Sequence, residues 1–313
     1  MANIIKHRLL TRSDLDGLVC AVLMKYIDMV DEIKLIDHPS AMQERSVKVF
    51  DTDITTNLPY VPGVHLAIDH HVSESMRNKE NEHHIIDPEA PSAARVVYNY
   101  FGGKNRFPDL FDDMMVGVDQ ADSGQFTKEE ILNPKGWALL NFLVDQRTGI
   151  EEFGNYGVLE EQFKLNLIEY CGRMKIDEIL ELPEVRERSE VYFEYEDKYR
   201  QQLQAAATIH NNIVVLDFRH QKIKYPVKYP GNRFIVYALF PQCNVSILLR
   251  TDPESNKTIF SVGKSIINRS SEVNIGKIML SYGGGGHRAA GACHMDSKYA
   301  DVAFKKLLSL LMR

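Results

Sequence analysis

The sequence has few cysteines, no membrane-length hydrophobic run and no repeat or low-complexity tract. Its four cysteines are scattered over 313 residues with no CxxC pair, which disfavours a disulfide framework or a structural zinc site. No apolar stretch approaches the ~18 residues that a membrane span needs. Residues 1–7 lack the apolar core of a signal peptide. We therefore expect a reduced, cytoplasmic protein with no membrane partner.

Basic residues are scarce in the first two thirds of the chain, and acidic residues are scarce in the last third. Residues 1–208 hold 22 Lys and Arg against 37 Asp and Glu, a net charge of −15. Residues 209–313 hold 15 against 6, a net charge of +9. An acidic part suits divalent cations and a basic part suits phosphate anions. The plain alternative for the acidic part is a solvated helical surface.

Length and patterning predict two domains of α/β type. Hydrophobic residues make up 44% of the chain and charged residues 26%, which is ordinary for a globular protein. Short apolar runs alternate with helical patterns early in the chain, and this predicts a mostly parallel sheet with flanking helices. We expect its strands at residues 3–12, 33–36, 47–50 and 64–68.

The rest of the chain predicts a helical segment and then a smaller α/β domain. Residues 136–208 have a helical pattern with few breakers. The β-like runs beyond it lie at residues 213–217, 233–240, 245–250 and 258–262, and the helices at 273–281 and 298–311. We predict a catalytic domain over residues 1–186, a connecting helix over 187–208, and a C-terminal domain with a mixed sheet over 209–313.

Polar side chains that can bind metal follow four of the apolar runs. They are Asp14 and Asp16 after residues 8–13, Asp51 after 47–50, Asp69, His70 and His71 after 64–68, and Asp122 after 111–118. The carboxyl ends of parallel strands meet at one edge of a sheet, where such folds bind their ligands. Buried carboxylates are rarely tolerated unless they are paired or coordinate metal.

Carboxylate and imidazole ligands without thiolate suit Mn²⁺, with Mg²⁺ as the alternative. Two such cations, about 3.5–4 Å apart, would activate a water and neutralise charge on a phosphoryl group. Alone, the pair Asp14 and Asp16 could equally be a helix N-cap or a turn, and paired histidines often lie on a surface. Four such groups in order favour the metal site.

A run of glycines at residues 283–286 precedes His287. Missing side chains allow the backbone to approach a ligand, and its N–H groups could cradle a phosphate or carboxylate. The alternative is a flexible cap after the helix at 273–281, although one cap does not need four glycines. Lys264 and Arg269 could neutralise a phosphate, or could be ordinary surface charges.

Taken together, these motifs resemble the DHH phosphoesterases with a DHH-associated C-terminal domain. RecJ nucleases and the NrnA-type oligoribonucleases and pAp phosphatases belong to this family. The matching pieces are residues 13–17 (SDLDG), 51–53 (DTD), 69–71 (DHH), 122–126 (DSGQF) and 283–291 (GGGGHRAAG). The resemblance covers nearly the whole chain. It implies two lobes joined by a helical linker, with the active site in the cleft between them.

The resemblance also implies a role for each motif residue. Asp14 and Asp51 would hold one Mn²⁺, and the other would be held by Asp16, Asp51, His70 and Asp122, with Asp51 bridging. Asp69 would orient its neighbours, and His71 would lie at the scissile phosphate as electrophile or general acid. The distal phosphate or nucleotide end would be gripped by Gly284, Gly285, Gly286 and His287, assisted by Arg288 and Lys264.

Two positions depart from the pattern of the small family members. Many of them carry a metal-binding histidine four residues before the first motif aspartate. Here that position is Leu10, and neither His7 nor Arg12 has the spacing to replace it. The first metal site is then weaker or filled from elsewhere, with Asp119 as the candidate. Lys264 stands where an arginine is usual, and a lysine cannot bind phosphate as a fork.

These observations predict a manganese-dependent phosphohydrolase that cleaves short nucleotides through a metal-activated water. Its candidate substrates are nanoRNA, linear or cyclic dinucleotides and pAp. A long duplex is disfavoured, because the net charge of −15 on residues 1–208 would repel its flanks. The alternatives are an exopolyphosphatase or pyrophosphatase, and a nucleotide sensor that no longer turns over. Homodimer formation stays open.

Overall fold

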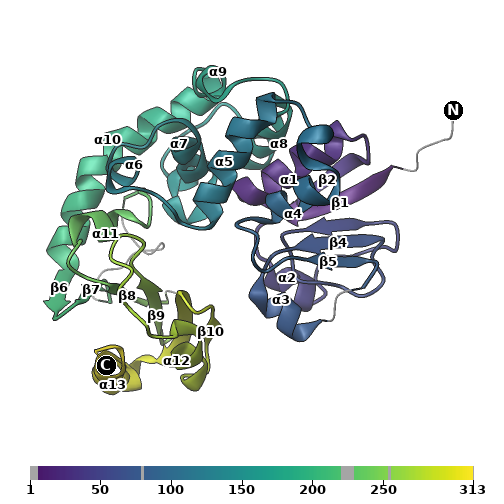
Figure 1. The fold of residues 1–313 in the computed structure, drawn as a ribbon. Helices are drawn as coiled ribbons and strands as arrows, with labels where there is room; N and C mark the ends of the chain where they lie inside the picture. Colours follow the sequence, from purple (N-terminus) through teal and green to yellow (C-terminus); the bar gives the residue numbers. More distant parts are fainter. Residues whose placement is uncertain (1–5, 79–80, 220–228, 253–254, 313) are drawn as a thin grey trace, which may run out of the picture. The chain divides into compact units, whose positions relative to one another are not determined.

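The computed structural model describes residues 6–78, 81–219, 229–252 and 255–312 (Figure 1). The chain forms two units: the first comprises Met1–Gln125, Lys135–Gln146 and Gly154–Ser189, and the second Phe126–Pro134, Arg147–Phe153 and Glu190–Arg313. Within the described ranges, no helix is long and apolar enough to cross a membrane. The domain limits drawn from the sequence (1–186, 187–208 and 209–313) stay predictions.

A parallel sheet forms the centre of the first unit. Its five strands lie in the order β2-β1-β3-β4-β5, and every neighbouring pair is parallel. The strands are β1 (His7–Arg12), β2 (Val30–Ile36), β3 (Ile54–Thr56), β4 (Leu66–Asp69) and β5 (His84–Ile86). The expected parallel α/β sheet is confirmed. The part of the first expected strand before residue 6 lies outside the described residues.

Helices cover this sheet and supply the rest of the core of the first unit. They are α1 (Leu15–Tyr26), α2 (Ser40–Gln43), α3 (Val72–Arg77), α4 (Ala93–Tyr100), η1 (Gly103–Asn105), α5 (Leu110–Asp122), α7 (Gly136–Val144), α8 (Glu160–Cys171) and α9 (Ile176–Leu180). Helix α1 is buried continuously from Leu15 to Met24, because helices such as α4, α5 and α8 pack around it. Burial on all sides explains why its sequence is apolar all round.

The expected strand at residues 47–50 was wrong. These residues form no strand, and β3 begins only at Ile54. Val47 and Val49 instead pack on a small core of Leu10, Ile36, Met42 and Leu58. An extended segment that covers a buried cluster alternates apolar and polar residues just as a strand does. The alternation therefore did not distinguish the two.

The second unit is built on a mixed sheet. Its six strands lie in the order β10-β11-β9-β8-β7-β6, and only β7 and β8 pair in parallel. The strands are β6 (Ala207–His210), β7 (Ile213–Asp217), β8 (Val245–Thr251), β9 (Lys257–Lys264), β10 (Gly285–Gly286) and β11 (Ala290–Asp296). The expected mixed C-terminal sheet is confirmed.

The helices of the second unit differ from expectation at one place. Residues 233–240 were predicted as a strand, but α11 (Ile235–Leu239) lies there. The other helical elements are α6 (Lys128–Leu132), η2 (Gln146–Thr148), η3 (Ile150–Glu152), α10 (Pro183–Ala206), α12 (Ile275–Ser281), η4 (Ser297–Tyr299) and α13 (Ala300–Leu311). Helix α10 contributes residues 183–189 to the first unit and the rest to the second.

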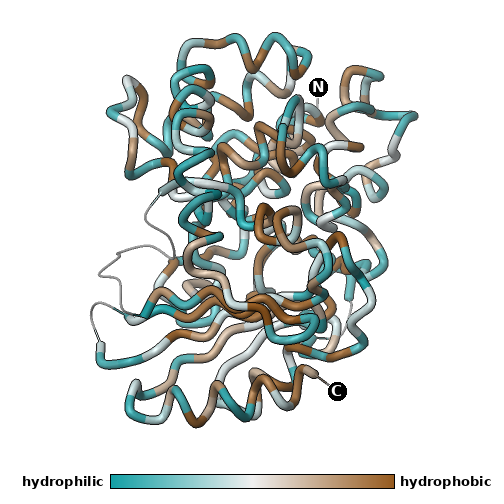
Figure 2. Tube along the Cα trace, turned by 90° about the vertical axis from the view of Figure 1, so that its left-hand side faces the viewer, coloured by the Kyte–Doolittle hydropathy of each residue, from teal (hydrophilic) through white to brown (hydrophobic). Residues whose placement is uncertain are grey.

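The core of the second unit lies between its sheet and two helices. Buried side chains of β7, β8, β9 and β11 pack against those of α12 and α13. Figure 2 shows the result: hydrophobic residues concentrate along the central strands and recur on one side of the C-terminal helix. This core positions the hairpin of β10 and β11, which carries the glycine run.

A buried group of charges lies between α8 and the start of α10 in the first unit. Lys164 and Arg188 are 2% and 0% exposed, and their nitrogens lie 3.2 and 3.5 Å from carboxylate oxygens of Glu160. The Lys164 ammonium also donates to the Ser13 hydroxyl over 3.0 Å. Helix α8 thereby holds the loop that precedes Asp14.

Glu160→Gln should lower the free energy of unfolding by about 3–5 kcal/mol, because it removes the negative charge between two buried cations. Urea unfolding with an unchanged m value measures this loss. Glu161→Gln, at the exposed neighbouring position, is the matched control and should stay within about 0.5 kcal/mol of the parent. Equal midpoints for the two variants would contradict this account of the buried charges.

Candidate functional site

At the carboxyl edge of the parallel sheet, three neighbouring strands are each followed or ended by a polar residue. Thr11 of β1 pairs with Thr56 of β3, and Thr56 pairs with Ile68 of β4. The next residues along these strands are Arg12, Asn57 and Asp69. The motif residues of the first unit follow directly: Asp14 and Asp16 after β1, and His70 and His71 after β4. Ligands of parallel sheets bind at this edge.

Asp16, His70 and Asp122 converge on one point. Each offers a ligand atom, and these three atoms lie within 4.8 Å of one another. The Nε2 atom of His70 lies 3.1 Å from Asp122 Oδ2 and 3.9 Å from Asp16 Oδ2. The three residues come from the start of α1, the end of β4 and the end of α5. The structure thus brings together three of the five predicted metal ligands.

The N-terminus of α4 fixes the position of Asp16. Its carboxylate is 2% exposed and accepts the backbone N–H groups of Ala93 and Ala94 over 3.0 and 2.7 Å. The positive end of the helix dipole favours a carboxylate there. Ser92 caps the same helix, and its hydroxyl donates to Asp119 over 2.7 Å.

Asp119 is held by the structure around α4. Besides Ser92, its carboxylate binds the guanidinium of Arg95, which donates from Nε over 2.8 Å. These contacts therefore do not support the prediction that Asp119 replaces the missing histidine as a metal ligand. Asp119 instead secures the helix end that holds Asp16.

The electrostatics of the Asp16–His70–Asp122 group fit a divalent cation. Burial, followed by the nearby Asp122 carboxylate, raises the pKa of Asp16 to about 7. Burial would lower the pKa of His70, but Asp122 and Asp16 raise it to about 10. The two carboxylates thus require positive charge beside them, which either a protonated His70 or a bound cation can supply. A cation bound between the ligand atoms would meet that requirement.

The orientation of the His70 ring supports the same conclusion. Its Nδ1 atom lies 3.2 Å from the carbonyl oxygen of Ala90, which favours a proton on Nδ1 and leaves the lone pair of Nε2 facing the carboxylates. Nε2 is buried and forms no hydrogen bond of regular geometry, although the Asp122 Oδ2 atom lies 3.1 Å away. An orphaned buried nitrogen among carboxylates is what a metal-ligating histidine leaves behind when its cation is removed.

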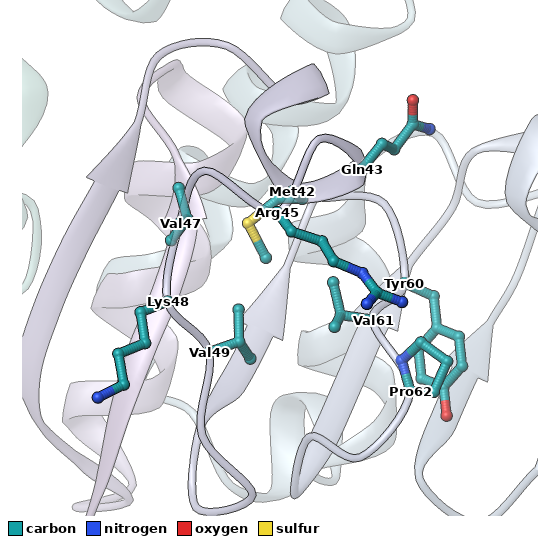
Figure 3. A pocket seen from close by; sticks show the side chains of 9 residues that line it. All are labelled: Met42, Gln43, Arg45, Val47, Lys48, Val49, Tyr60, Val61 and Pro62. Atoms are coloured by element: carbon teal, nitrogen blue, oxygen red, sulfur yellow. The ribbon is translucent and has the colours of Figure 1, made fainter.

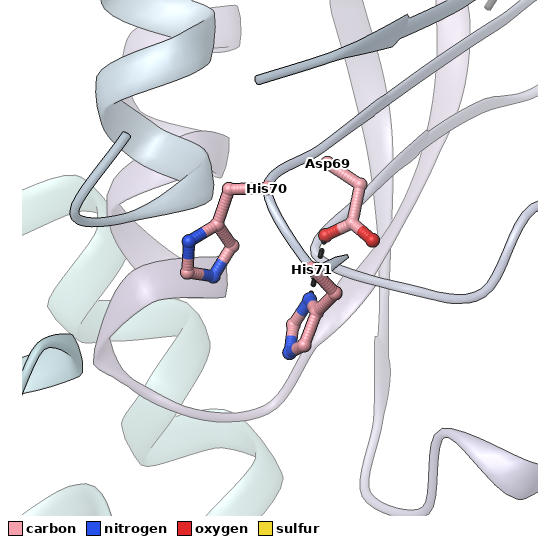
Figure 4. A group of neighbouring side chains, drawn as sticks. All are labelled: Asp69, His70 and His71. Atoms are coloured by element: carbon pink, nitrogen blue, oxygen red, sulfur yellow. Dashed lines mark hydrogen bonds and ion pairs between the residues drawn. The ribbon is translucent and has the colours of Figure 1, made fainter. Parts of the chain in front are cut away.

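His71 is oriented by Asp69 and not by the metal-binding group. Figure 4 shows the two rings diverging from the end of β4, with a hydrogen bond between His71 and Asp69. The His71 Nδ1 and Asp69 Oδ1 atoms are 2.8 Å apart, and Asp69 is 2% exposed. Burial would lower the pKa of His71, but the Asp69 carboxylate raises it. Asp69 therefore holds a protonated Nδ1 in place.

Asp14 has other partners. It is the N-cap of α1, and its Oδ1 accepts from the backbone N–H of Gly17 over 3.1 Å. The same oxygen accepts from Asn57 Nδ2 over 3.1 Å, and Oδ2 lies 2.9 Å from Arg12 Nε. The N-cap interpretation of this aspartate is confirmed. Within the described ranges, Asp14 belongs to no group of converging metal-ligand atoms.

Asp51 does not end a strand, and this expectation was wrong. It lies in an exposed turn before β3, at the edge of the sheet opposite Asp16 and His70. Asp53, two residues later, is 1% exposed and pairs there with Arg8 over 2.7 Å. The residue that does leave the carboxyl end of β3 is Asn57. A metal role for Asp51 stays an untested prediction that its position disfavours.

In the second unit, packing within the chain explains most of the glycine run. Gly283 (φ +76°) follows α12 as its left-handed cap. A Cβ atom on Gly284 would lie 2.1 Å from the Ala292 carbonyl oxygen, and one on Gly286 would lie 2.3 Å from that of Ala290. A Cβ on Gly283 or on Gly285 would meet open space, but the positive φ of Gly283 already favours glycine there. The part of the run open to a ligand is thus Gly285.

The other predicted substrate-binding residues surround this hairpin. Gly285, His287 and Arg288 are exposed, and the Arg288 guanidinium lies 3.6 Å from the exposed Glu272 carboxylate. The Lys264 ammonium donates to the backbone carbonyl of Ser271 over 2.7 Å. Lys264 therefore supports the segment before α12, while the exposed residues are accessible to a ligand.

Comparison with solved structures identifies the family. A pGpG-specific phosphodiesterase, PggH, from Vibrio cholerae is 46% identical to this chain, and the match covers 98% of this chain and 99% of that chain with a TM-score of 0.83. This chain belongs to the DHH phosphoesterase family. The resemblance inferred from residues 13–17, 69–71 and 283–291 is therefore confirmed.

Other likenesses to this phosphoesterase are weaker. RecJ from Thermus thermophilus, solved with Mn²⁺, is 15% identical with a TM-score of 0.47, and the match covers 98% of this chain and 52% of that chain. CDC45 from Entamoeba histolytica is 9% identical with a TM-score of 0.48, over 98% of this chain and 96% of that chain. No protein-family model and no curated protein matches the chain.

A pocket of about 550 Å³ lies elsewhere on the first unit of the phosphoesterase. Figure 3 shows its lining by side chains of residues 42–49 and 60–62, with the Arg45 guanidinium directed toward Tyr60. None of the predicted site residues lines it. It lies beside the small core around Leu10 and Met42, so its location gives no link to the phosphoesterase chemistry.

Two residues at the carboxyl edge of the parallel sheet were not predicted from the sequence. Asn57 follows the short β-branched run Ile54–Thr56, which was the available signal for a strand. Arg12 precedes the SDLDG motif and was dismissed because its spacing did not match that of the expected histidine. Register with β3 and contact with Asp14 are what place both residues at the site.

Gly284→Ala and Gly285→Ala should separate packing from ligand binding. Gly284→Ala should cost about 1–3 kcal/mol of stability through overpacking against β11. Gly285→Ala should melt like the parent, yet raise KM for a nucleotide substrate roughly tenfold, because a methyl group would block close approach of the backbone. Thermal melts and initial rates measure both effects. An unchanged KM in Gly285→Ala would remove this loop from the binding site.

Proposed function

We propose that this phosphoesterase hydrolyses the phosphodiester bond of the linear dinucleotide pGpG. The observation that carries the proposal is the 46% identity to a pGpG-specific phosphodiesterase over 98% of this chain. The site of the first unit is consistent with it, because the carboxylates and imidazoles gathered at one sheet edge suit phosphoryl chemistry. The products would be two mononucleotides.

The cation of this site is proposed to be Mn²⁺, with Mg²⁺ as the alternative. Asp16, His70 and Asp122 would hold it, since their ligand atoms lie within 4.8 Å of one another. When bound, a divalent cation polarises a phosphoryl oxygen and lowers the pKa of a water. An imidazole among the ligands favours Mn²⁺ over Mg²⁺, which prefers oxygen ligands alone.

The residues of the chain would then perform two further tasks. His71, with Nδ1 bound to the buried Asp69, would present its other nitrogen to the scissile phosphate as electrophile or general acid. The backbone at Gly285, with the side chains of His287 and Arg288, would grip the terminal phosphate, since the N–H groups of Gly284 and His287 already donate to Met279 and Ala290. The exposure of that hairpin supports this second role.

The setting of the activity follows from the same observations. We infer a cytoplasmic enzyme, because all four cysteines are free, buried thiols, as is usual in a reducing compartment. The partner is a short nucleotide, and neither a long duplex nor a membrane is required. A homodimer remains an open prediction.

A substrate panel tests the proposal. Purified protein with Mn²⁺, and separately with Mg²⁺, would be given pGpG, pApA, a cyclic dinucleotide, pAp and polyphosphate. We expect pGpG to be cleaved with a kcat/KM at least about tenfold above that for pApA. Activity on polyphosphate alone would favour the exopolyphosphatase alternative. Binding of pGpG without turnover in either metal would favour the sensor.

A further inference from the structure

A second divalent cation does not fit the residues at this catalytic edge. The residue that follows β3 at this edge is Asn57, which is neutral and 1% exposed. The position expected for a histidine is Leu10, which is 0% exposed. Asp51 lies at the other edge of the sheet. Of the residues expected around a second cation, the site therefore retains Asp14. Asp69, His70 and His71 also offer ligand atoms within 4.8 Å of one another, but this group shares His70 with the first, and Asp69 and His71 are hydrogen-bonded to each other.

Asp14 in turn is already neutralised by Arg12. The Arg12 Nε atom lies 2.9 Å from Asp14 Oδ2, and the other carboxylate oxygen accepts from Gly17 and Asn57. A cation on Asp14 would have to displace these partners and lie beside a guanidinium. Repulsion by a fixed positive charge makes that unfavourable.

Arg12 ends β1 at the same edge of the sheet at which His70 follows β4. It follows Thr11, which pairs with Thr56, the residue before Asn57, and it lies two residues before Asp14 and four before Asp16. In the part of the chain that the structure describes, its one ion pair is to Asp14 through Nε. Its two Nη groups form no ion pair there.

We propose that this phosphoesterase binds one divalent cation, in the Asp16–His70–Asp122 group, and that the Arg12 guanidinium supplies the second positive charge to the substrate phosphate. A guanidinium presents a planar fork of N–H donors that matches two phosphate oxygens. Asp14 orients that fork through Nε, and Asn57 orients Asp14. The identity of the phosphate ester in this proposal rests on the proposed function. The number of bound cations does not depend on it.

Metal stoichiometry is the first test, because it is independent of turnover. Mn²⁺ titrated into the metal-free full-length protein should bind at one ion per chain, with the EPR spectrum of a mononuclear site. Two ions per chain with an exchange-coupled spectrum would overturn the proposal. The double variant Arg12→Ala with Asn57→Asp, which removes the guanidinium and adds a carboxylate next to Asp14, should gain a second ion. Failure to gain one would contradict the claim that these two residues exclude it.

Activity of Arg12 variants is the second test. Arg12→Ala should keep one Mn²⁺ and lose about 10²–10³-fold in kcat/KM for pGpG, Arg12→Lys should lose less, and added methylguanidinium should restore part of the Arg12→Ala activity. Arg45→Ala, an exposed arginine of the pocket in Figure 3, is the matched control and should stay within twofold. Near-parental activity in Arg12→Ala, or a large loss in Arg45→Ala alone, would overturn the assignment.

The two tests distinguish failure of this inference from failure of the proposed function. A parent protein that leaves pGpG intact while binding one Mn²⁺ would refute the substrate and keep the one-cation site. The Arg12 series would then be repeated with whichever phosphate ester the panel selects. A parent that cleaves pGpG with two bound ions would keep the proposed function and refute the inference.

Discussion

Asp16→Ala should lower kcat/KM for pGpG by at least about 10³-fold and abolish tight Mn²⁺ binding, whereas Asp51→Ala should leave both within about twofold. Both aspartates belong to motifs that the sequence assigns to metal. They differ in the edge of the sheet at which they lie: Asp16 is buried beside His70 and Asp122, and Asp51 is exposed before β3. Loss of a carboxylate ligand removes charge stabilisation in the transition state.

Isothermal titration with Mn²⁺ and steady-state kinetics would measure the two effects. Because Asp16 also accepts two amide hydrogen bonds from α4, Asp16→Asn provides a second variant that keeps an acceptor there. Urea unfolding of all three variants would show whether the fold survives. A large loss of activity in a stable Asp51→Ala protein would contradict the placement of the site and restore Asp51 as a ligand.

His71→Gln should lower kcat by about 10²–10⁴-fold while the protein still binds its cation. The physical reason is that His71 is oriented by Asp69 and lies outside the Asp16–His70–Asp122 group, so its removal affects proton transfer or phosphate polarisation and not metal retention. His70→Gln should instead lose cation and activity together. Metal content and kcat, measured on the same samples, separate the two histidines.

His83→Gln is the matched control for this prediction. His83 is an exposed histidine of the same unit whose Nδ1 lies 2.9 Å from the His65 carbonyl oxygen, and its replacement should leave kcat unchanged. Asp69→Asn should also lower kcat, but by less than His71→Gln, because it leaves the imidazole present but poorly oriented. Retention of full kcat in His71→Gln would exclude this histidine from the chemistry.

Much of the fold could be predicted because its elements have strong periodic signals. The buried run from Leu15 to Met24 is apolar on all sides and became α1, and the runs ending at Arg12 and Asp69 became parallel strands. The two expected strands that did not form, at residues 47–50 and 233–240, are short apolar segments, and β5, β6 and β11 were not predicted. Over four to eight residues, a strand, a covering loop and a short helix have the same composition.

The candidate site was predictable where the ligand follows a clear strand. Asp16 and His70 come directly after buried strands, so the parallel topology placed them at one edge. The prediction that Asp51 lies at this edge was wrong because the strand expected before it, at residues 47–50, does not form. Asn57 and Arg12 could not be recognised, since neither residue type signals a site unless its neighbour in space is known.

The order of the motifs by itself determined the family, the acidic and basic halves, and the residue types available for chemistry. Only the tertiary structure decided which of those residues meet, because strand register and the end of a strand at which a residue lies depend on pairing between distant segments. The register of β1, β3 and β4 brings Arg12, Asn57 and Asp69 to the carboxyl edge of the sheet. Asp51 precedes β3 and so lies at the opposite edge. Close packing around the glycine run likewise reserved Gly284 and Gly286 for the fold, which leaves Gly285 for a ligand.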